Sequence, residues 1–466
     1  MSRPATLGEL RASGWVSRPV KEELREHAVE VLAAGKPLVE GVIGYEDTVL
    51  PQLATAVLAG HDVIFLGERG QAKTRTIRTL VNLLDEWMPI VAGSEINDDP
   101  YHPISAHARH LIADRGDETP IEWVHRSKRY GEKLATPDTS IADLIGEVDP
   151  IKVAEGRYLS DELTLHYGMV PRTNRGIFAI NELPDLAERI QVGLLNVLEE
   201  RDVQIRGYKI QLPIDLVLFA SANPEDYTNR GRIITPLKDR FGAQIRTHYP
   251  LETSTEVAII EQEARPMDAV PGVDVIVPGF MKQLVAEISQ QARRSPHVNQ
   301  RSGVSARMSI TNYETLLANA TRRALVAGER EVSPRISDLE AIVASTAGKI
   351  EIETVDDGRE GYVLERIVKS AILEVFRDLV KPEYLGDVVR SFEGGFSVQA
   401  GEDIPVAEYV ASLDTLPLGP ILADLGVEGQ PAAIASAVEF VLEGMHLTKR
   451  LNKDDLRGTA TYRGRG

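Results

Sequence analysis

The sequence predicts an α/β protein whose first half is a three-layer domain with a parallel sheet and whose second half is mostly helical. In the first half, short and nearly continuous apolar runs alternate with helical stretches, as is typical of strands buried on both faces. The three best strand candidates are residues 62–66, Gly176–Asn181 and Leu216–Ala222. After Pro250 the strand patterns fade and amphipathic helices dominate.

Length and pattern together divide the chain into four parts. At 466 residues the chain exceeds the size at which one hydrophobic core stops growing. The predicted parts are a helical lead-in over residues 1–38, the α/β domain over 39–250, a helical domain over 251–349 and a second helical domain over 350–466. Polar, charged and proline-containing sequence over about 93–140 predicts a long surface insertion within the α/β domain.

Helical periodicity and end signals support the two helical parts. Residues 308–327 have apolar positions at helical spacing and are followed by Gly328, a residue that favours helix ends. Two more amphipathic helices are predicted, one over residues 364–379 and one from Pro431 to about Leu447.

The composition excludes several classes of function. There are no cysteines, so disulfides, thiolate nucleophiles and cysteine-held metal sites are ruled out. No apolar run is long enough to span a bilayer and the first residues lack a signal-peptide core, so we expect a cytoplasmic protein without membrane insertion. The net charge of −18 disfavours nucleic acid as a partner. The basic tail over 449–466 is expected to be disordered, with an arm for nucleic acid or an acidic partner as the alternative.

One turn has the composition of a phosphate-binding loop. It lies between the predicted strand 62–66 and an amphipathic helix over 75–84, and it consists of Gly67, Glu68, Arg69, Gly70, Gln71, Ala72, Lys73 and Thr74. In such a loop backbone N–H groups surround phosphate, a lysine reaches the terminal phosphates and a hydroxyl joins the magnesium shell. Ala72 stands where glycine allows the closest approach, so its methyl group tightens the loop or weakens binding. The alternative is an ordinary strand–turn–helix corner.

Polar side chains follow the next two predicted strands. Glu182 is suited to activate water as a general base, and Asn181 occupies the position of a magnesium-orienting acid. An amide brings no negative charge, so we expect lower metal affinity than an aspartate would give. Asn223 ends the following strand and is suited to position the attacking water. The alternatives are an ordinary strand-end turn and an Asn-Pro turn.

An arginine at a predicted helix end completes the set. Arg240 lies in the sequence Leu-Lys-Asp-Arg-Phe-Gly, and in a ring such a residue reaches the neighbouring subunit's nucleotide and stabilises transition-state charge. The alternative is a surface arginine in a salt bridge.

The order of these motifs resembles the magnesium-chelatase I-subunit and MoxR-type branch of AAA+ proteins. The segments that carry the resemblance, over roughly residues 40–345, are 43–47, 59–63, 172–177, 222–225 and 239–242. The resemblance implies an AAA+ three-layer α/β domain, a helical lid and an additional C-terminal helical domain. It also implies ATP and Mg²⁺ as cofactors.

The same resemblance implies further roles and partners. Arg307 matches the second-sensor arginine that contacts the γ-phosphate in the assembled ring. Self-association into a ring is expected, with a hexamer as its size, and with it a partner that has a von Willebrand A-type domain. Residues 143–167 lie where relatives insert an extra hairpin or helix, and residues 202–212 are predicted to form a second hairpin. In relatives these protrusions face the pore or partners; decoration of the sheet is the alternative.

Three functions stay open at the level of sequence. The first is a motor that uses ATP to remodel or activate a partner protein, and the second is the ATPase subunit of a magnesium chelatase that inserts Mg²⁺ into a porphyrin. The third is a scaffold that binds nucleotide and hydrolyses it slowly or not at all, as Ala72 and Asn181 suggest. His102, His107 and His110 are irregularly spaced in a polar segment, so we expect solvated side chains rather than a metal site.

Overall fold

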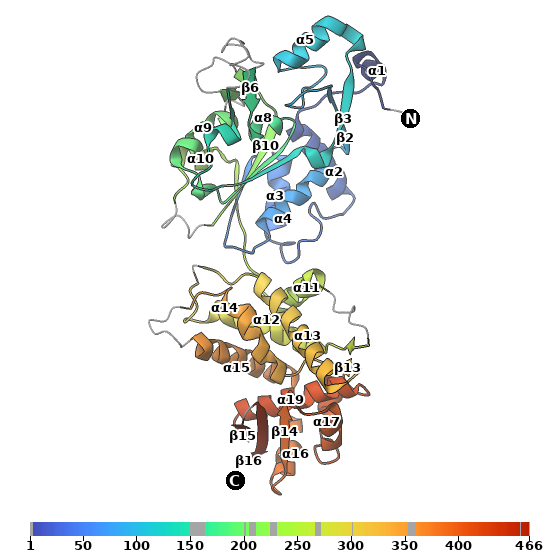
Figure 1. Cartoon of the computed structure of the whole chain (residues 1–466), viewed down its shortest axis with the longest axis vertical. Helices are drawn as coiled ribbons and strands as arrows, with labels where there is room; N and C mark the ends of the chain where they lie inside the picture. The colour runs from blue at the N-terminus through green and yellow to red at the C-terminus, as the bar shows by residue number, and fades with distance from the viewer. Residues whose placement is uncertain are drawn as a thin grey trace. The chain divides into compact units, whose positions relative to one another are not determined.

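The chain folds into two compact units, which Figure 1 shows coloured along the sequence. The computed structural model describes residues 3–148, 164–199, 202–204, 211–223, 231–265, 272–300, 302–352, 360–456 and 458–465. The first unit is Met1–His248 and the second is Tyr249–Gly466. Within the described ranges, no helix is both long and apolar enough to cross a membrane.

A five-stranded parallel sheet forms the centre of the first unit. Its strands, in spatial order, are β11 (Ala243–Arg246), β1 (Val63–Leu66), β10 (Leu216–Ala222), β7 (Gly176–Asn181) and β4 (Tyr130–Leu134). Every neighbouring pair is parallel. All side chains of β1, β7 and β10 are buried, which explains their continuous apolar sequences. The predicted α/β class with a parallel sheet is confirmed.

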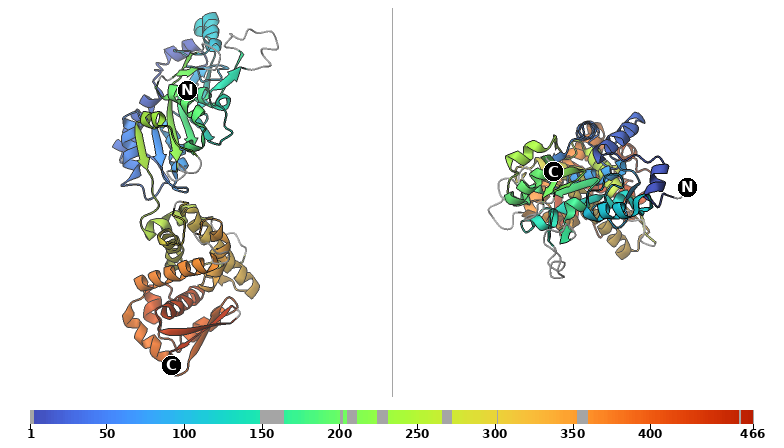
Figure 2. Two further views of the ribbon diagram at one scale, coloured as in Figure 1. Left: turned by 90° about the vertical axis from the view of Figure 1, so that its left-hand side faces the viewer. Right: turned by 90° about the horizontal axis from the view of Figure 1, so that it is seen from above.

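Helices cover both faces of this sheet and complete three layers. On one face α2 (Val20–Ala33), α3 (Val49–Leu58) and α4 (Lys73–Thr79) contribute to a core that includes Ile177 and Phe219. On the other face α9 (Glu188–Glu199) and α10 (Thr235–Arg240) pack with Phe178 and Leu218. Successive residues of one strand thus enter opposite cores. In Figure 2 the blue helices lie along the strands of this unit.

The predicted lead-in over 1–38 is an integral part of the first unit. Glu23 of α2 forms a buried ion pair with Arg129, whose guanidinium donates to the carboxylate at 2.7 and 2.6 Å. Lys21 bonds Asp62 at 3.0 Å. The lead-in is therefore fixed to the sheet by charge pairs as well as by apolar contacts.

The prediction of a surface insertion over 93–140 is wrong in its second part. Residues 106–115 form α5 (Ala106–Arg115), and β3 (Ile121–His125) pairs antiparallel with β2 (Trp87–Val91). The next strand, β4, is an edge of the central sheet. Its sequence, Tyr-Gly-Glu-Lys-Leu, is only partly buried, so it lacks the apolar run that marks an inner strand.

The second unit has a single large core, where sequence reasoning expected two domains divided at residue 349. Phe280 of α12 (Gly279–Arg294) stacks on Phe440 of α19 (Pro431–Leu447), with ring centroids 4.7 Å apart. Helix α15 (Glu360–Leu379) packs against both. The lid and the accessory part therefore share one core, because apolar faces from both sides of residue 349 cover each other.

The basic tail is ordered, which corrects the prediction of disorder. Strands β15 (Leu451–Leu456) and β16 (Thr459–Gly464) form an antiparallel hairpin that β14 (Ser397–Gly401) extends. Tyr462 is buried and donates to Glu443 of α19 at 2.5 Å. Alternation of buried and exposed residues over a few positions was too short a signal to outweigh the basic and glycine-rich composition.

Smaller elements complete both units. In the first unit they are α1 (Leu7–Ala12), α6 (Ile141–Leu144), β5 (Gly146–Val148), β6 (Leu165–Tyr167), α8 (Met169–Arg172), β8 (Asp202–Gln204) and β9 (Gln211–Pro213). In the second they are α11 (Thr253–Glu263), β12 (Asp274–Val275), α13 (Arg307–Ala327), β13 (Glu331–Val332), α14 (Ile342–Ala347), α16 (Pro382–Phe392), α17 (Val406–Ser412) and α18 (Gly419–Asp424). The first of the two predicted protrusions, a hairpin or helix, contains the antiparallel pair β5–β6, and the second, a hairpin, contains the pair β8–β9. Residues 149–163 and 205–210 between these strands lie outside the described residues.

Candidate nucleotide-binding site

The loop over residues 67–74 joins β1 to α4, as the motif predicts. A Cβ atom at Gly67 would overlap the side-chain oxygens of Thr247 and Gln71, so a larger residue here would displace the contact between them. Ala72 has φ 53° and ψ 13°, a left-handed conformation that costs an L-residue about 1–2 kcal/mol. The chain therefore makes the sharp bend of a phosphate loop in spite of the methyl group at Ala72.

Lys73 lies across the loop. Its ammonium group donates to the carbonyl oxygens of Gly67 and Glu68, the latter at 2.6 Å, and the residue is 6% exposed. The donors of the lysine are thus held over the bend, where the motif places the terminal phosphates.

Two side chains from other segments hold the loop in place. Tyr45 donates from its hydroxyl to the carbonyl of Gln71 at 2.8 Å and to that of His248 at 2.9 Å. Burial raises the pKa of this phenol, so it stays a donor at neutral pH. Thr247 donates to the side chain of Gln71 at 2.6 Å. Neither Tyr45 nor Thr247 is predicted from the sequence to act here, although Tyr45 lies in a segment that carries the resemblance.

The predicted magnesium ligands meet at the carboxyl ends of the strands. The hydroxyl of Thr74 donates to Asn181 Oδ1 at 3.1 Å, and the hydroxyl of Ser221 donates to the same oxygen at 3.1 Å. Parallel strands place their carboxyl ends at one edge of the sheet, which is why residues so distant in sequence converge.

Glu182 and Asn223 lie at the same edge. Glu182 follows β7 with φ 55° and ψ 50°, and its N–H donates to the hydroxyl of Ser221 at 3.3 Å. A left-handed conformation at a non-glycine residue is a strain that is often found at functional sites. Asn223 follows β10, the neighbour of β7, and is 8% exposed; Pro224 and Glu225 of its motif lie outside the described residues.

Glu132 is a further acidic residue at this edge of the sheet, and it was not predicted from the sequence. It lies on β4, beside β7, and its carboxylate accepts from the side-chain amide of Asn181 at 2.7 Å. Burial by itself raises the pKa of Glu132, but hydrogen bonds from Arg78, Tyr130 and Asn181 outweigh it and bring the pKa below its ordinary value. A carboxylate therefore stands next to the amide that replaces the expected acid.

The two predicted arginines stay predictions. Arg240 is the last residue of α10 and donates to the carbonyl of Pro236 at 3.0 Å. Arg307 is the first residue of α13, in the second unit, and is exposed. Both predicted roles depend on contacts that form only when subunits assemble into a ring.

Comparison with known proteins yields a consistent set of relatives. No family model matches the chain. The magnesium-chelatase subunit ChlI of Nostoc is 26% identical over 354 residues, which cover 70% of this chain and 87% of that protein. The ChlI-1 subunit of Arabidopsis thaliana is 27% identical over 289 residues, 56% of this chain and 65% of that protein. The chain is an AAA+ protein that is similar in sequence to magnesium-chelatase I subunits.

Solved structures add little to this assignment. A model of the complex between subunits BchI and BchD of magnesium chelatase is 22% identical, covers 70% of this chain and 98% of that chain, and has a TM-score of 0.36. A putative ATPase from Cytophaga hutchinsonii is 14% identical, covers 78% and 98%, and has a TM-score of 0.31. With TM-scores this low, the two structures do not support the fold assignment. The AAA+ fold is supported instead by the strand order of the central sheet and by the loop over residues 67–74.

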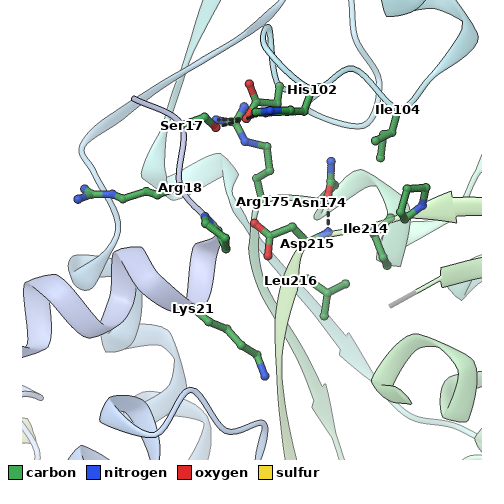
Figure 3. Close-up of a pocket in the computed structure, with 13 residues that line it drawn as sticks. Ser17, Arg18, Lys21, His102, Ile104, Asn174, Arg175, Ile214, Asp215 and Leu216 are labelled. Atoms are coloured by element: carbon green, nitrogen blue, oxygen red, sulfur yellow. Dashed lines mark hydrogen bonds and ion pairs between the residues drawn. The ribbon is translucent and has the colours of Figure 1, made fainter. Parts of the chain in front are cut away.

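A cavity of about 500 Å³ lies at the opposite, amino-terminal edge of the sheet of this AAA+ chain (Figure 3). Two of its charged side chains bond to the backbone of neighbouring segments: the carboxylate of Asp215 accepts from Val20 N–H at 2.7 Å, and Arg175 donates to the carbonyl of Pro89 at 2.8 Å. We assign these groups to fixing the N-terminal segment rather than to ligand binding.

From the sequence, His102, His107 and His110 are expected to be solvated rather than to bind a metal. His102 lines this cavity, 3.9 Å from Asp99, and His107 contacts the carbonyl of Ala92 at 3.0 Å. In the part of the chain that the structure describes, no three histidine or acidic side chains are grouped to hold a metal ion.

Proposed function

We propose that this protein binds ATP with Mg²⁺ at the loop over residues 67–74 and couples ATP hydrolysis to the remodelling or activation of a partner protein. The observation that carries the proposal is the meeting of the loop with the ends of β7 and β10, where Thr74 bonds Asn181 at 3.1 Å beside Glu182. The similarity to ChlI subunits supports it.

The side chains suit distinct tasks in this reaction. Lys73 and the loop N–H groups bind the terminal phosphates. Thr74 and Asn181 present oxygen atoms, the donors that Mg²⁺ prefers, close together, so these two residues would hold the ion. Bound Mg²⁺ supplies positive charge that neutralises the phosphate oxygens. Glu182 takes the proton from the attacking water, and Asn223 orients that water.

We further propose that the protein works as a ring, with a hexamer as its size. Arg240 then acts on the nucleotide of the neighbouring subunit, and Arg307 contacts the γ-phosphate. The relatives are named as subunits of a larger enzyme, which supports a protein partner for this chain as well. A partner with a von Willebrand A-type domain fits this proposal.

The second candidate function is the ATPase subunit of a magnesium chelatase, which the names of the relatives favour. The two candidates differ in their partners. The Glu182→Gln variant binds ATP without hydrolysing it, so its complexes should persist. In a pull-down from native cells with ATP, this variant is expected to retain a protein client. Recovery of a very large porphyrin-binding subunit instead would support the chelatase function and contradict a client-remodelling motor.

Lys73→Ala tests whether the loop is the nucleotide site. We expect loss of binding of a fluorescent ATP analogue and loss of phosphate release. Lys128→Ala is the matched control, since it removes an exposed lysine from the same unit. Unchanged binding and turnover in Lys73→Ala would contradict the site assignment, whereas binding without turnover in the unmodified protein would favour a nucleotide-dependent scaffold.

A further inference from the structure

Glu132 brings a negative charge next to Asn181, whose amide stands where the motif expects an acid. The end of β7 carries the amide of Asn181, and Glu132 lies on the adjacent strand β4. The amide nitrogen of Asn181 donates to Glu132 Oε1 at 2.7 Å, and Asn181 is 7% exposed. The charge is thus one hydrogen bond away from the oxygen that faces the loop.

The hydrogen bonds of Glu132 fix which way the amide points. Its two oxygens accept from Arg78 at 2.7 and 2.8 Å, from Tyr130 at 2.8 Å and from Asn181. A carboxylate that only accepts requires the NH₂ group of Asn181 to face it, so Oδ1 must face the hydroxyls of Thr74 and Ser221. A rotated amide would place its oxygen against the carboxylate.

The same contacts decide how Glu132 acts. Four hydrogen bonds occupy its oxygens, so the carboxylate is engaged on β4 and reaches the loop only through Asn181. Arg78 is 62% exposed in its side chain, so its ion pair with Glu132 contributes little to stability by itself. The partly buried contact with Asn181 is the one that connects Glu132 to the loop.

We propose that Glu132 is a positioning residue that orients Asn181 toward Thr74 and supplies, from the neighbouring strand, the negative charge that an amide at position 181 does not bring. The acidic function of this site is then divided between two strands. This inference rests on the proposed binding of ATP and Mg²⁺ at the loop. Outer partners of metal-binding side chains contribute about tenfold to a hundredfold in metal affinity, which sets the scale of the effect.

A charge-exchange experiment tests this proposal by binding rather than by turnover. The affinity for a fluorescent ADP analogue is measured with and without Mg²⁺, and the ratio gives the gain due to the ion. Glu132→Gln is expected to lower this gain about tenfold. The double variant Glu132→Gln with Asn181→Asp is expected to restore it, because the amide introduced on β4 can donate to the carboxylate introduced on β7. Glu122→Gln is the matched control, at an exposed glutamate on β3 of the same unit.

The outcomes separate the inference from the proposed function. An equal gain in Glu132→Gln and the unmodified protein would overturn the role of Glu132 alone, whereas no gain in the unmodified protein would overturn the Mg²⁺ site itself. Affinity without Mg²⁺ reports whether each variant is folded. If Glu132→Gln is not folded, the double variant is used in its place. A gain due to Mg²⁺ equal to that of the unmodified protein supports the proposal, and a smaller gain overturns it.

Discussion

Replacing Ala72 by glycine is expected to stabilise the first unit. Ala72 has φ 53°, a conformation that costs an L-residue about 1–2 kcal/mol and glycine almost nothing. Glycine also gains conformational entropy in the unfolded chain, which offsets about 0.4–1 kcal/mol of this. The net stabilisation is therefore about 0.5–1 kcal/mol.

Tryptophan fluorescence during urea denaturation measures this effect directly. All three tryptophans, Trp15, Trp87 and Trp123, belong to the first unit, so the full-length protein reports the unfolding of this unit. We expect a midpoint about 0.2–0.5 M higher in urea for Ala72→Gly. The control is Ala113→Gly, at an exposed position of α5, which should destabilise by up to about 1 kcal/mol. Destabilisation in both variants would refute the left-handed conformation at Ala72.

Three further predictions concern other parts of the structure. Arg129→Met leaves Glu23 buried without its partner and should destabilise the first unit by about 3–5 kcal/mol, measured by the same fluorescence. Because the pKa of Glu132 is lowered on folding, its contribution to the stability of the first unit is present above pH 4.5 and is lost as the pH falls through the folded-state pKa. In this pH range the urea midpoint of Glu132→Gln should therefore fall less with decreasing pH than that of the unmodified protein. Tyr462→Phe removes the 2.5 Å bond to Glu443 and should destabilise the second unit by about 1–3 kcal/mol, measured by circular dichroism because that unit has no tryptophan.

The inner part of the central sheet could be predicted from the sequence, whereas its edges could not. The strands β1, β7 and β10 are buried on both faces and therefore read as apolar runs. The edge strands β4 and β11 are partly exposed and carry polar residues, so they resemble loops. Because β4 was not predicted as a strand, Glu132 was not recognised as a residue of the candidate site.

The residues of the candidate site were predictable to the extent that they belong to local motifs. Lys73, Thr74, Asn181 and Glu182 stand next to strands in the sequence, and the structure brings them to one edge. Contacts such as that of Asn181 with Glu132 depend on which strands are neighbours, and one sequence does not contain that information. The second unit shows the same limit, because its single core joins apolar faces on either side of residue 349.

ATP turnover by Glu182→Gln is the most direct test of the central claim, that this edge of the sheet is a catalytic site. The variant keeps the size of the side chain and removes its ability to accept a proton. We predict that it binds an ATP analogue as tightly as the unmodified protein and that steady-state phosphate release falls by about 100-fold or more. Phosphate release at the unmodified rate, with binding retained, would contradict the account.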